Sequence, residues 1–223
     1  MAIPIQRLDL LISNAFLVGE GSERVLIDTG ADMVYGRLRK RLDKAGVKPG
    51  DIKLVVLTHA HPDHAGNAGR LKRDFGCEVA VHATEAEWLR TGTTELYQPC
   101  GFFGHVLDRV IPRTFDACEP DRVLDGDERI EIAPSIGALQ LLHTPGHTPG
   151  HLCVEMEGGE LFAGDLMRGG MIQSDFVGGP FFIKDRGELN RSIDRIKARR
   201  PCCLHFGHGK RADGGALQKA DLH

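Results

Sequence analysis

A short histidine-rich segment directly after an apolar run is the feature that most constrains this chain. The run Leu54–Leu57 has four apolar residues in succession, which is typical of a buried strand. The segment that follows brings together three imidazoles and one carboxylate and reads Thr58-His59-Ala60-His61-Pro62-Asp63-His64. Imidazole nitrogen and carboxylate oxygen are ligands that Zn²⁺ and Fe²⁺ accept. The sequence therefore predicts a metal site at the end of a buried strand.

The spacing within this segment divides its donors into two sets. Alternate residues of an extended segment share a face, so His59, His61 and Asp63 fall on one alternation. His64 comes one residue later and is expected to point elsewhere. The segment can thus serve two metal ions, with His59 and His61 on one and Asp63 with His64 on the other.

Two further acidic residues follow apolar runs. Asp165 comes after Leu161–Ala163, and Gly164 permits a tight backbone between them. An unpartnered carboxylate at a buried strand end is costly, so a cation is a reasonable partner for Asp165. Asp28 ends the run Val25–Ile27, and metal-bound histidines often donate their second N–H to a carboxylate. We expect Asp28 to orient a ligand rather than to bind metal.

Composition is that of an ordinary soluble globular protein. The 223 residues suit a single domain, 1–223, with a hydrophobic fraction of 41% and a charged fraction of 26%. The net charge of −3 and the scattered Lys and Arg residues argue against nucleic-acid and membrane partners. We see no signal peptide and no membrane-spanning run, and the six cysteines show no CxxC spacing. A cytoplasmic protein with reduced thiols is expected.

Strand and helix patterns occur in both halves of the chain, with donor residues at strand ends. We expect an opening hairpin across 19–22, and helices at about 35–45, 65–75 and 185–199. A short helix at 84–89 could be capped by Thr84. Further strands are expected at 78–81, 130–133, 139–142, 152–155, 160–163 and 202–206. The pattern fits two sheets packed face to face with helices outside.

The segment 91–120 departs from this pattern, because Gly and Pro residues interrupt its apolar residues. Long segments without periodicity are usually functional or disordered, and the aromatic residues here argue against disorder. We interpret it as an insertion that folds over the metal site, with weak substrate contacts from Phe102, Phe103 and His105. The apolar, glycine-rich segment 167–182 is expected at the edge of the same pocket, and such loops could form a homodimer interface.

Five motifs in chain order resemble those of the metallo-β-lactamase superfamily. They are Val25–Gly30, Thr58–His64, His143–His151, Leu161–Asp165 and Phe206–Gly209. The resemblance covers nearly the whole chain and implies an α/β fold, the four-layered αβ/βα sandwich. It also implies that His147 completes the first metal site, that His208 completes the second, and that Asp165 bridges both ions. His151 would then support the ligands or pack beside them.

The resemblance further implies a metal-dependent hydrolase that uses a metal-bridging hydroxide to cleave a small ester, thioester or lactone. Two divalent ions would lower the pKa of the bridging water. We expect zinc, with iron or manganese also compatible. Asp63 would act in catalysis by orienting the hydroxide and carrying a proton to the leaving group. The expected partner is thus a small-molecule substrate.

Within the superfamily the motifs are most similar to glyoxalase II-like thioesterases, with lactonases close behind. True zinc β-lactamases carry Cys or Ser where this chain has Asp165, which argues against β-lactam hydrolysis. Only 15 residues follow His208, whereas glyoxalase II has a helical region there that holds glutathione with basic residues, so we do not expect a glutathione thioester as the substrate. Lactonases usually place a Tyr three residues after the bridging Asp, where this chain has Arg168, a candidate for holding a substrate anion.

An oxidoreductase is the alternative function. Persulfide dioxygenases are similar in sequence pattern too, and use one Fe²⁺ on residues corresponding to His59, His61, His147 and Asp165. The presence of Asp63, His64 and His208 favours two ions. A non-catalytic role is disfavoured, because all seven candidate ligands are present.

Overall fold

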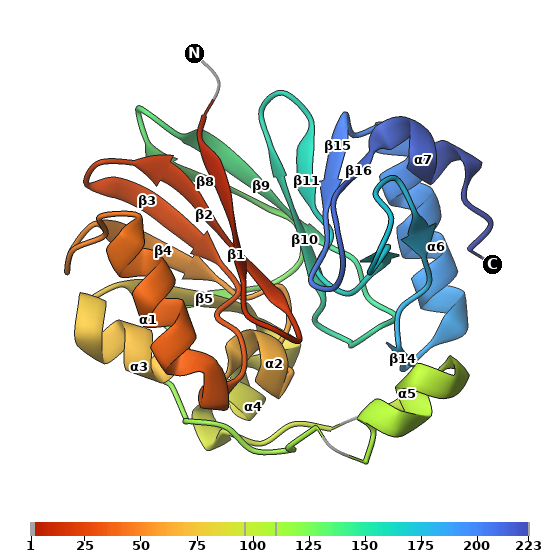
Figure 1. Cartoon of the computed structure of the whole chain (residues 1–223), viewed down its shortest axis with the longest axis horizontal. Helices are drawn as coiled ribbons and strands as arrows, with labels where there is room; N and C mark the ends of the chain where they lie inside the picture. The colour runs from red at the N-terminus through yellow and green to blue at the C-terminus, as the bar shows by residue number, and fades with distance from the viewer. Residues whose placement is uncertain (1–2, 96, 110, 223) are drawn as a thin grey trace.

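Two mixed sheets lie face to face, and helices cover their outer sides (Figure 1). The structure is a computed structural model that describes residues 3–95, 97–109 and 111–222, without the side chain of Phe103. Six strands form each large sheet within those residues. The four-layered αβ/βα sandwich expected from the sequence is therefore confirmed.

The first sheet joins an antiparallel meander to a parallel half. Its strands in spatial order are β1 (Ile5–Asp9), β2 (Asn14–Glu20), β3 (Glu23–Ile27), β4 (Ile52–Val56), β5 (Glu78–His82) and β7 (Arg122–Leu124). The pairs from β3 to β7 are parallel. Only Lys53 of β4 is exposed, as expected for a parallel strand covered on both faces. Parallel strands end at one edge, so the segments after β3 and β4 meet there.

The second sheet is antiparallel except for one central pair. Its strands in spatial order are β16 (Ala212–Asp213), β15 (Cys203–His205), β11 (Glu160–Phe162), β10 (Leu152–Met156), β9 (Gly137–His143) and β8 (Glu128–Ala133). The parallel pair is β11 with β15. Both strands therefore end at the same edge, which brings the segments that carry Asp165 and His208 together.

Three buried clusters separate the four layers. The helices α1 (Tyr35–Lys44), α3 (Ala68–Phe75) and α4 (Ala86–Thr91) cover the first sheet, and α6 (Arg186–Arg199) and α7 (Gly214–Lys219) cover the second. Phe16, Leu54 and Phe162 belong to the cluster between the sheets. No helix in the described part of the chain is long and apolar enough to cross a membrane.

Two local expectations need correction. The helix expected at 65–75 is divided into α2 (Pro62–Ala65) and α3. Thr84 does not cap the helix that follows it, because it lies inside a 3₁₀ turn, η2 (Ala83–Glu85). The residue before that turn is the cap, since the His82 side chain accepts a hydrogen bond from the Thr84 N–H.

The expected insertion, 91–120, pairs with a strand from the second half of the chain. Its strand β6 (Gln98–Pro99) pairs with β14 (Phe182–Ile183) and leads into helix α5 (Gly101–Leu107). A second small pair, β12 (Arg168–Gly169) with β13 (Val177–Gly178), folds the segment after Asp165 back on itself. Figure 1 shows α5 beside β14, at the edge of the sandwich where the donor-bearing segments end.

Candidate metal centre

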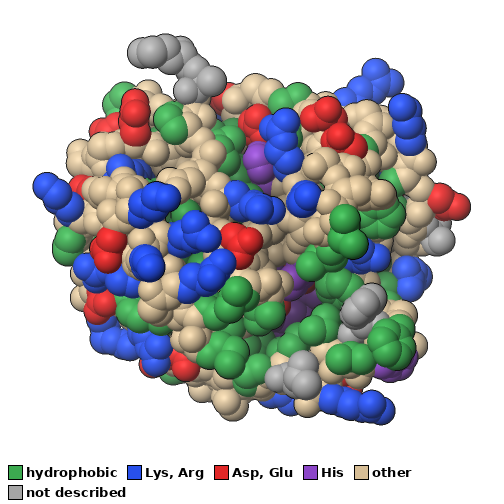
Figure 2. Space-filling model, in the orientation of Figure 1, with side chains coloured by type: hydrophobic (Ala, Val, Ile, Leu, Met, Phe, Trp, Pro, Cys, Tyr) green, Lys and Arg blue, Asp and Glu red, His purple; other side chains and the backbone are tan. Residues whose placement is uncertain are grey.

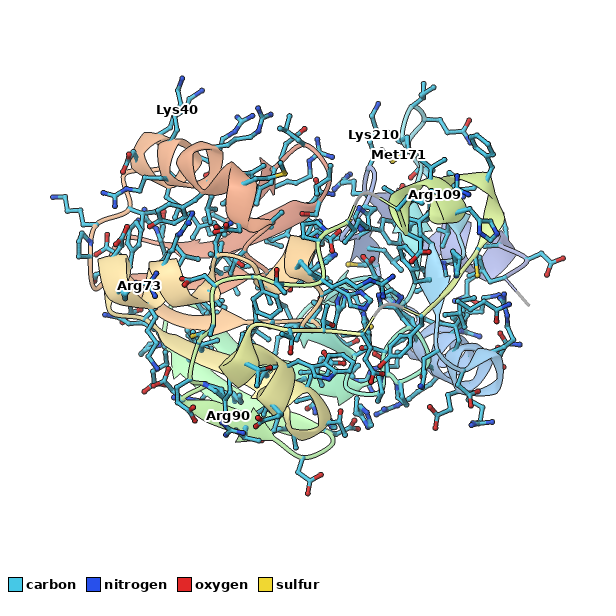
Figure 3. All side chains as sticks on the ribbon, turned by 90° about the horizontal axis from the view of Figure 1, so that it is seen from below. Lys40, Arg73, Arg90, Arg109, Met171 and Lys210 are labelled. Carbon is cyan, nitrogen blue, oxygen red and sulfur yellow. The ribbon has the colours of Figure 1, made fainter. Side chains whose placement is uncertain are left out.

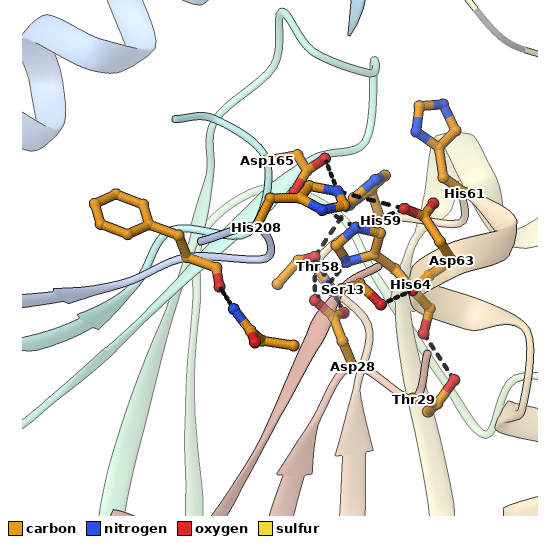
Figure 4. Close-up of polar contacts among 12 residues, drawn as sticks. Ser13, Asp28, Thr29, Thr58, His59, His61, Asp63, His64, Asp165 and His208 are labelled. Atoms are coloured by element: carbon orange, nitrogen blue, oxygen red, sulfur yellow. Dashed lines mark hydrogen bonds and ion pairs between the residues drawn. The ribbon is translucent and has the colours of Figure 1, made fainter. Parts of the chain in front are cut away.

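Segments from both sheets bring seven buried donor residues together at one edge of the sandwich. They are His59, His61, Asp63, His64, His147, Asp165 and His208, and each is at most 8% exposed. Figure 4 shows most of them converging above the ends of the strands. The structure therefore places all seven predicted ligands in one cluster.

The first group of donors is formed by His59, His61 and His147. The His147 Nε2 lies 3.2 Å from His59 Nε2 and 3.2 Å from His61 Nδ1. The other ring nitrogen of each histidine contacts an oxygen, which belongs to Thr58 Oγ1, Glu95 O and Phe182 O respectively. Three ring nitrogens thus meet in one buried space.

The outer hydrogen bonds determine where these rings carry their protons. A carbonyl oxygen only accepts, so His61 Nε2 and His147 Nδ1 are donors. The Thr58 hydroxyl donates to the Asp28 carboxylate and so accepts from His59 Nδ1. Burial, together with neighbouring histidines, lowers the pKa of His59 well below its usual value and that of His61 to about 3. Three neutral lone pairs therefore face one another, and a cation between them fits this arrangement.

The second group is formed by Asp63, His64 and His208, and Asp165 contacts both groups. His208 Nε2 lies 3.3 Å from Asp63 Oδ2 and 3.1 Å from Asp165 Oδ2. The Asp165 carboxylate is also 3.4 Å from His64 Nε2 and 3.8 Å from His147 Nε2. Asp165 therefore stands between the two groups, where a bridging ligand would have to be.

The charges in the second group also call for a cation. Burial lowers the pKa of His208, but the carboxylates of Asp165 and Asp63 outweigh it and raise this pKa to about 10. The same carboxylates raise the pKa of His64 well above its usual value despite burial. His64 Nε2 and Asp165 Oδ1 are buried without a hydrogen-bond partner. A divalent ion that displaced the protons would satisfy both atoms.

The local backbone explains how one short segment serves both groups. His61 is the N-cap of α2, with φ −71° and ψ 150°, and Pro62 begins the helix. Asp63 and His64 lie on a helical turn, so the expectation that Asp63 continues an extended alternation is wrong. One donor group holds His59 and His61 and another holds Asp63 and His64, as expected, while a third group joins His59 with His64 and Asp165.

Asp28 lies beneath the second group and contacts the ring nitrogen of His64 that faces away from the other donors. Its carboxylate is 2.9 Å from His64 Nδ1 and accepts from the Thr58 backbone N–H at 2.8 Å (Figure 4). No donor group among the described residues includes Asp28. Its φ of +59° is unusual for a residue with a side chain, and several bonds are needed to hold it. This placement suits the orienting role expected for Asp28.

The two histidines of the third motif differ in what they contact. His147 faces the first donor group, whereas the His151 Nε2 accepts a hydrogen bond from the Asp165 N–H at 3.0 Å. The His151 Nδ1 therefore carries the proton and donates to Thr144 Oγ1 at 2.9 Å. His151 is fully buried and supports the segment that holds Asp165.

Glu85 is a functional candidate that the sequence reasoning missed. Its fully buried carboxylate accepts from the Ala60 N–H at 2.5 Å and from the Gly150 N–H at 2.9 Å. It therefore joins the segment of His59 and His61 to the segment of His147. Burial raises the pKa of Glu85 to about 6. In the sequence it resembles any acidic residue at the start of a helix, which gives no sign of burial.

A cavity of about 340 Å³ opens over the donor cluster. His61, Asp63, Asp165 and His208 form its polar side, and most of its other lining residues are apolar. Figure 2 shows a hollow with histidine inside and hydrophobic side chains around it.

Only some of the residues expected to contact substrate line this cavity. Arg168 lines this cavity, whereas Phe102 and His105 are exposed and do not. Val106 and Leu107 of the same helix line it instead. The side chain of Phe103 lies outside the described residues. A role in substrate binding stays a prediction for Phe102, Phe103 and His105.

The fold and the buried donor cluster define a metal-binding protein of the αβ/βα sandwich class. Residues 8–208 match the sequence profile of the metallo-beta-lactamase superfamily, and the chain belongs to that superfamily. Among solved structures, BLEG-1 B3 metallo-beta-lactamase is similar with a TM-score of 0.72 and 24% identity, covering 97% of each chain. This likeness concerns the fold.

Relatives at higher identity include proteins of several kinds. The uncharacterized protein YobT of Bacillus subtilis is 31% identical over 205 residues, which are 88% of this chain and 83% of YobT. Hydroxyacylglutathione hydrolase GloC of Haemophilus influenzae is 32% identical over 158 residues, 70% of this chain and 67% of GloC. The probable metallo-hydrolase MJ0888 of Methanocaldococcus jannaschii is 28% identical and covers 94% of both chains.

Proposed function

We propose that this protein is a cytoplasmic, binuclear zinc-dependent hydrolase that cleaves a small ester, thioester or lactone. The observation that carries the proposal is the position of Asp165, within 3.8 Å of donors from both histidine groups. The relationship to hydroxyacylglutathione hydrolase GloC supports a thioester or ester substrate.

Each donor group would hold one ion. His59, His61 and His147 would bind the first, Asp63, His64 and His208 the second, and Asp165 both. Divalent ions held there would activate a water molecule as a nucleophile and polarise a carbonyl oxygen. The seven side chains come from segments that follow strands of both sheets, so a folded sandwich would position them before substrate arrives.

Asp63 is the residue best placed to move a proton during hydrolysis. It lines the cavity, and its carboxylate is close to the groups that would hold the second ion. Burial raises the pKa of Asp63, but His64 and His208 outweigh it and hold this pKa below its usual value. An ionised carboxylate at the cavity wall can accept a proton and pass it to a leaving group.

The apolar cavity would bind the substrate and exclude water from it. Its walls contain few polar groups apart from the donor cluster and Arg168. The alternative with one iron needs only His59, His61, His147 and Asp165. It gives no ligand role to the buried Asp63, His64 and His208, so this second group supports the binuclear hydrolase.

Metal content measured by elemental mass spectrometry, with Asp63→Ala alongside, tests the proposal. We expect about two zinc ions per chain, fewer in the variant, and hydrolysis of at least one class among esters, thioesters and lactones. One iron per chain that is unchanged in Asp63→Ala, with oxygen uptake on persulfides, would overturn the proposal.

A further inference from the structure

We propose that the substrate combines an apolar acyl group, bound in the cavity, with an anionic group bound by the guanidinium of Arg168. This inference rests on the proposed function, because it assigns a substrate class to that site. It comes from two observations that are independent of the metal donors. The first is an apolar cavity wall, and the second is an arginine for which no acidic partner occurs among the described residues.

Much of the remaining cavity wall is built from aliphatic side chains. They come from the loop after β1, from α5 and its following turn, and from the loop after β12, and are Leu11, Ile12, Val106, Leu107, Ile111 and Met171. Leu11 and Met171 remain 67% and 62% exposed, so the mouth of the cavity is also apolar. Figure 3 shows Met171 at the end of the molecule that carries α5. An apolar chain entering here would bury these exposed surfaces as well as its own.

The energetic consequence is a dependence of affinity on chain length. Each methylene transferred from water to an apolar site strengthens binding by up to about fourfold. Small polar acyl groups would leave the wall in contact with water. The cavity therefore favours an acyl group of several carbons over acetyl.

Arg168 introduces a positive charge at the same wall. Its guanidinium lies over two phenyl rings, 5.4 Å from the centroid of Phe176 and 5.1 Å from that of Phe181. These rings hold the planar group and leave its N–H donors free to meet a ligand. Burial lowers the pKa of Arg168, and no neighbouring carboxylate offsets the effect.

Arg168 differs from the arginines of α6 that form ion pairs on the protein surface. Arg195 pairs with Asp127, and Arg199 pairs with Glu155. Within residues 3–95, 97–109 and 111–222, no carboxylate forms an ion pair with Arg168. A partly desolvated cation without a counterion is unfavourable unless a ligand supplies the negative charge. Arg168 is therefore suited to bind an anion in the cavity that the metal donors also line.

Arg168 lies between two hollows, and each could hold one part of the proposed substrate. Arg168 and Phe181 line the metal cavity and also a second hollow of about 350 Å³, which contains Arg186. An anionic group at Arg168 can therefore extend into this hollow while the acyl group fills the apolar cavity. A carboxylate and a phosphate both match the guanidinium, and the arrangement assigns an oxyanion of either kind.

Binding of thioethers to the metal-loaded protein tests this inference without any hydrolysis. The probes are the S-octyl thioethers of mercaptopropionate, of mercaptopropionamide and of mercaptoethyl phosphate, measured by calorimetry. We expect one or both anions to bind about tenfold or more tightly than the neutral amide. Arg168→Gln should remove this preference and leave amide binding unchanged. Arg191→Gln, which removes an exposed charge from α6, should retain it.

The outcomes separate this inference from the proposed hydrolase. Equal binding of the anions and the amide to the wild type, or an affinity that does not rise from butyl to octyl, would overturn the inference. Hydrolysis of octanoyl thioesters with no preference for an anionic leaving group would also overturn it, while the proposed hydrolase would stand. Anion-selective binding that depends on Arg168, with no hydrolysis of any acyl substrate, would support the inference and refute the hydrolase.

Discussion

The imidazole of His151 accepts a hydrogen bond at its Nε2 from the backbone N–H of Asp165, at 3.0 Å. The same ring contacts Thr144 Oγ1 through its Nδ1. Asp165 contacts histidines of both donor groups, and its backbone is held by His151, which is in none of the donor groups found among the described residues. We therefore expect His151 to position the proposed bridging ligand.

His151→Leu should lower both stability and metal content. The substitution leaves the buried Asp165 N–H without its acceptor, which costs about 1–3 kcal/mol of unfolding free energy. Asp165 is then free to move, so the number of ions bound per chain should fall. His143→Leu is the control, because it loses a hydrogen bond to Pro149 O but none to Asp165. Equal metal content in the two variants would show that His151 only packs.

Asp28→Asn should weaken the second metal site more than the first. The amide can no longer accept from both Thr58 and His64, and loss of such an outer hydrogen bond typically costs about 10–100-fold in metal affinity. Competition with a chelator, followed by elemental analysis, measures the two affinities. Asp32→Asn should change neither, since Asp32 pairs with Arg70 outside the donor cluster. An unchanged second affinity in Asp28→Asn would contradict the orienting role.

Glu85→Ala should affect the first metal site in particular. The variant removes the acceptor for the Ala60 and Gly150 N–H groups, both within three residues of a first-group histidine. Two unpaired buried donors predict a loss of roughly 2–5 kcal/mol in stability by chemical denaturation. First-site affinity should fall with it. Glu87→Ala, on the exposed side of α4, should leave both quantities unchanged, and a similar loss in that control would remove the case for Glu85.

Stability of the metal-free protein should also depend on pH through Glu85. Burial raises its pKa from 4.5 in the unfolded chain to about 6 in the folded protein, so the folded state holds this proton more tightly. The contribution is fully present below about pH 4.5 and is lost as pH rises through about 6. It amounts to about 2 kcal/mol at most, at about 1.4 kcal/mol per pKa unit. Glu85→Gln should lack this dependence, and identical pH profiles would argue against it.

The metal affinities of the two sites should depend on pH to different extents. The carboxylates around His208 raise its pKa to about 10, so an ion must displace a proton there at neutral pH. Second-site affinity should therefore rise about tenfold per pH unit from pH 6 to 8 for each proton displaced. The first-group histidines are neutral in this range, with the pKa of His61 at about 3, so first-site affinity should be flat. Calorimetry in buffers of different ionisation enthalpy counts the protons, and equal release at both sites would contradict the assignment.

Much of the fold and part of the site could be predicted from local sequence. The run Leu54–Leu57 indicated a buried strand, and the spacing from His59 to His64 indicated two donor sets. Even there, one reason was wrong, because Pro62 begins a helix and ends the extended backbone at His61. Asp63 and His64 still belong to a donor group without His61, because a helical turn also directs adjacent side chains differently.

The spacing of donors within a few residues was determined by the sequence alone, because the backbone allows few local conformations. The meeting of Asp165, His147 and His208 was decided by the tertiary structure, which places the ends of β9, β11 and β15 at one edge. That packing also places His151 against the Asp165 backbone, buries Glu85 between two loops and leaves Arg168 without an ion pair among the described residues. Such contacts join residues far apart in the chain, and no local pattern records which loops will touch.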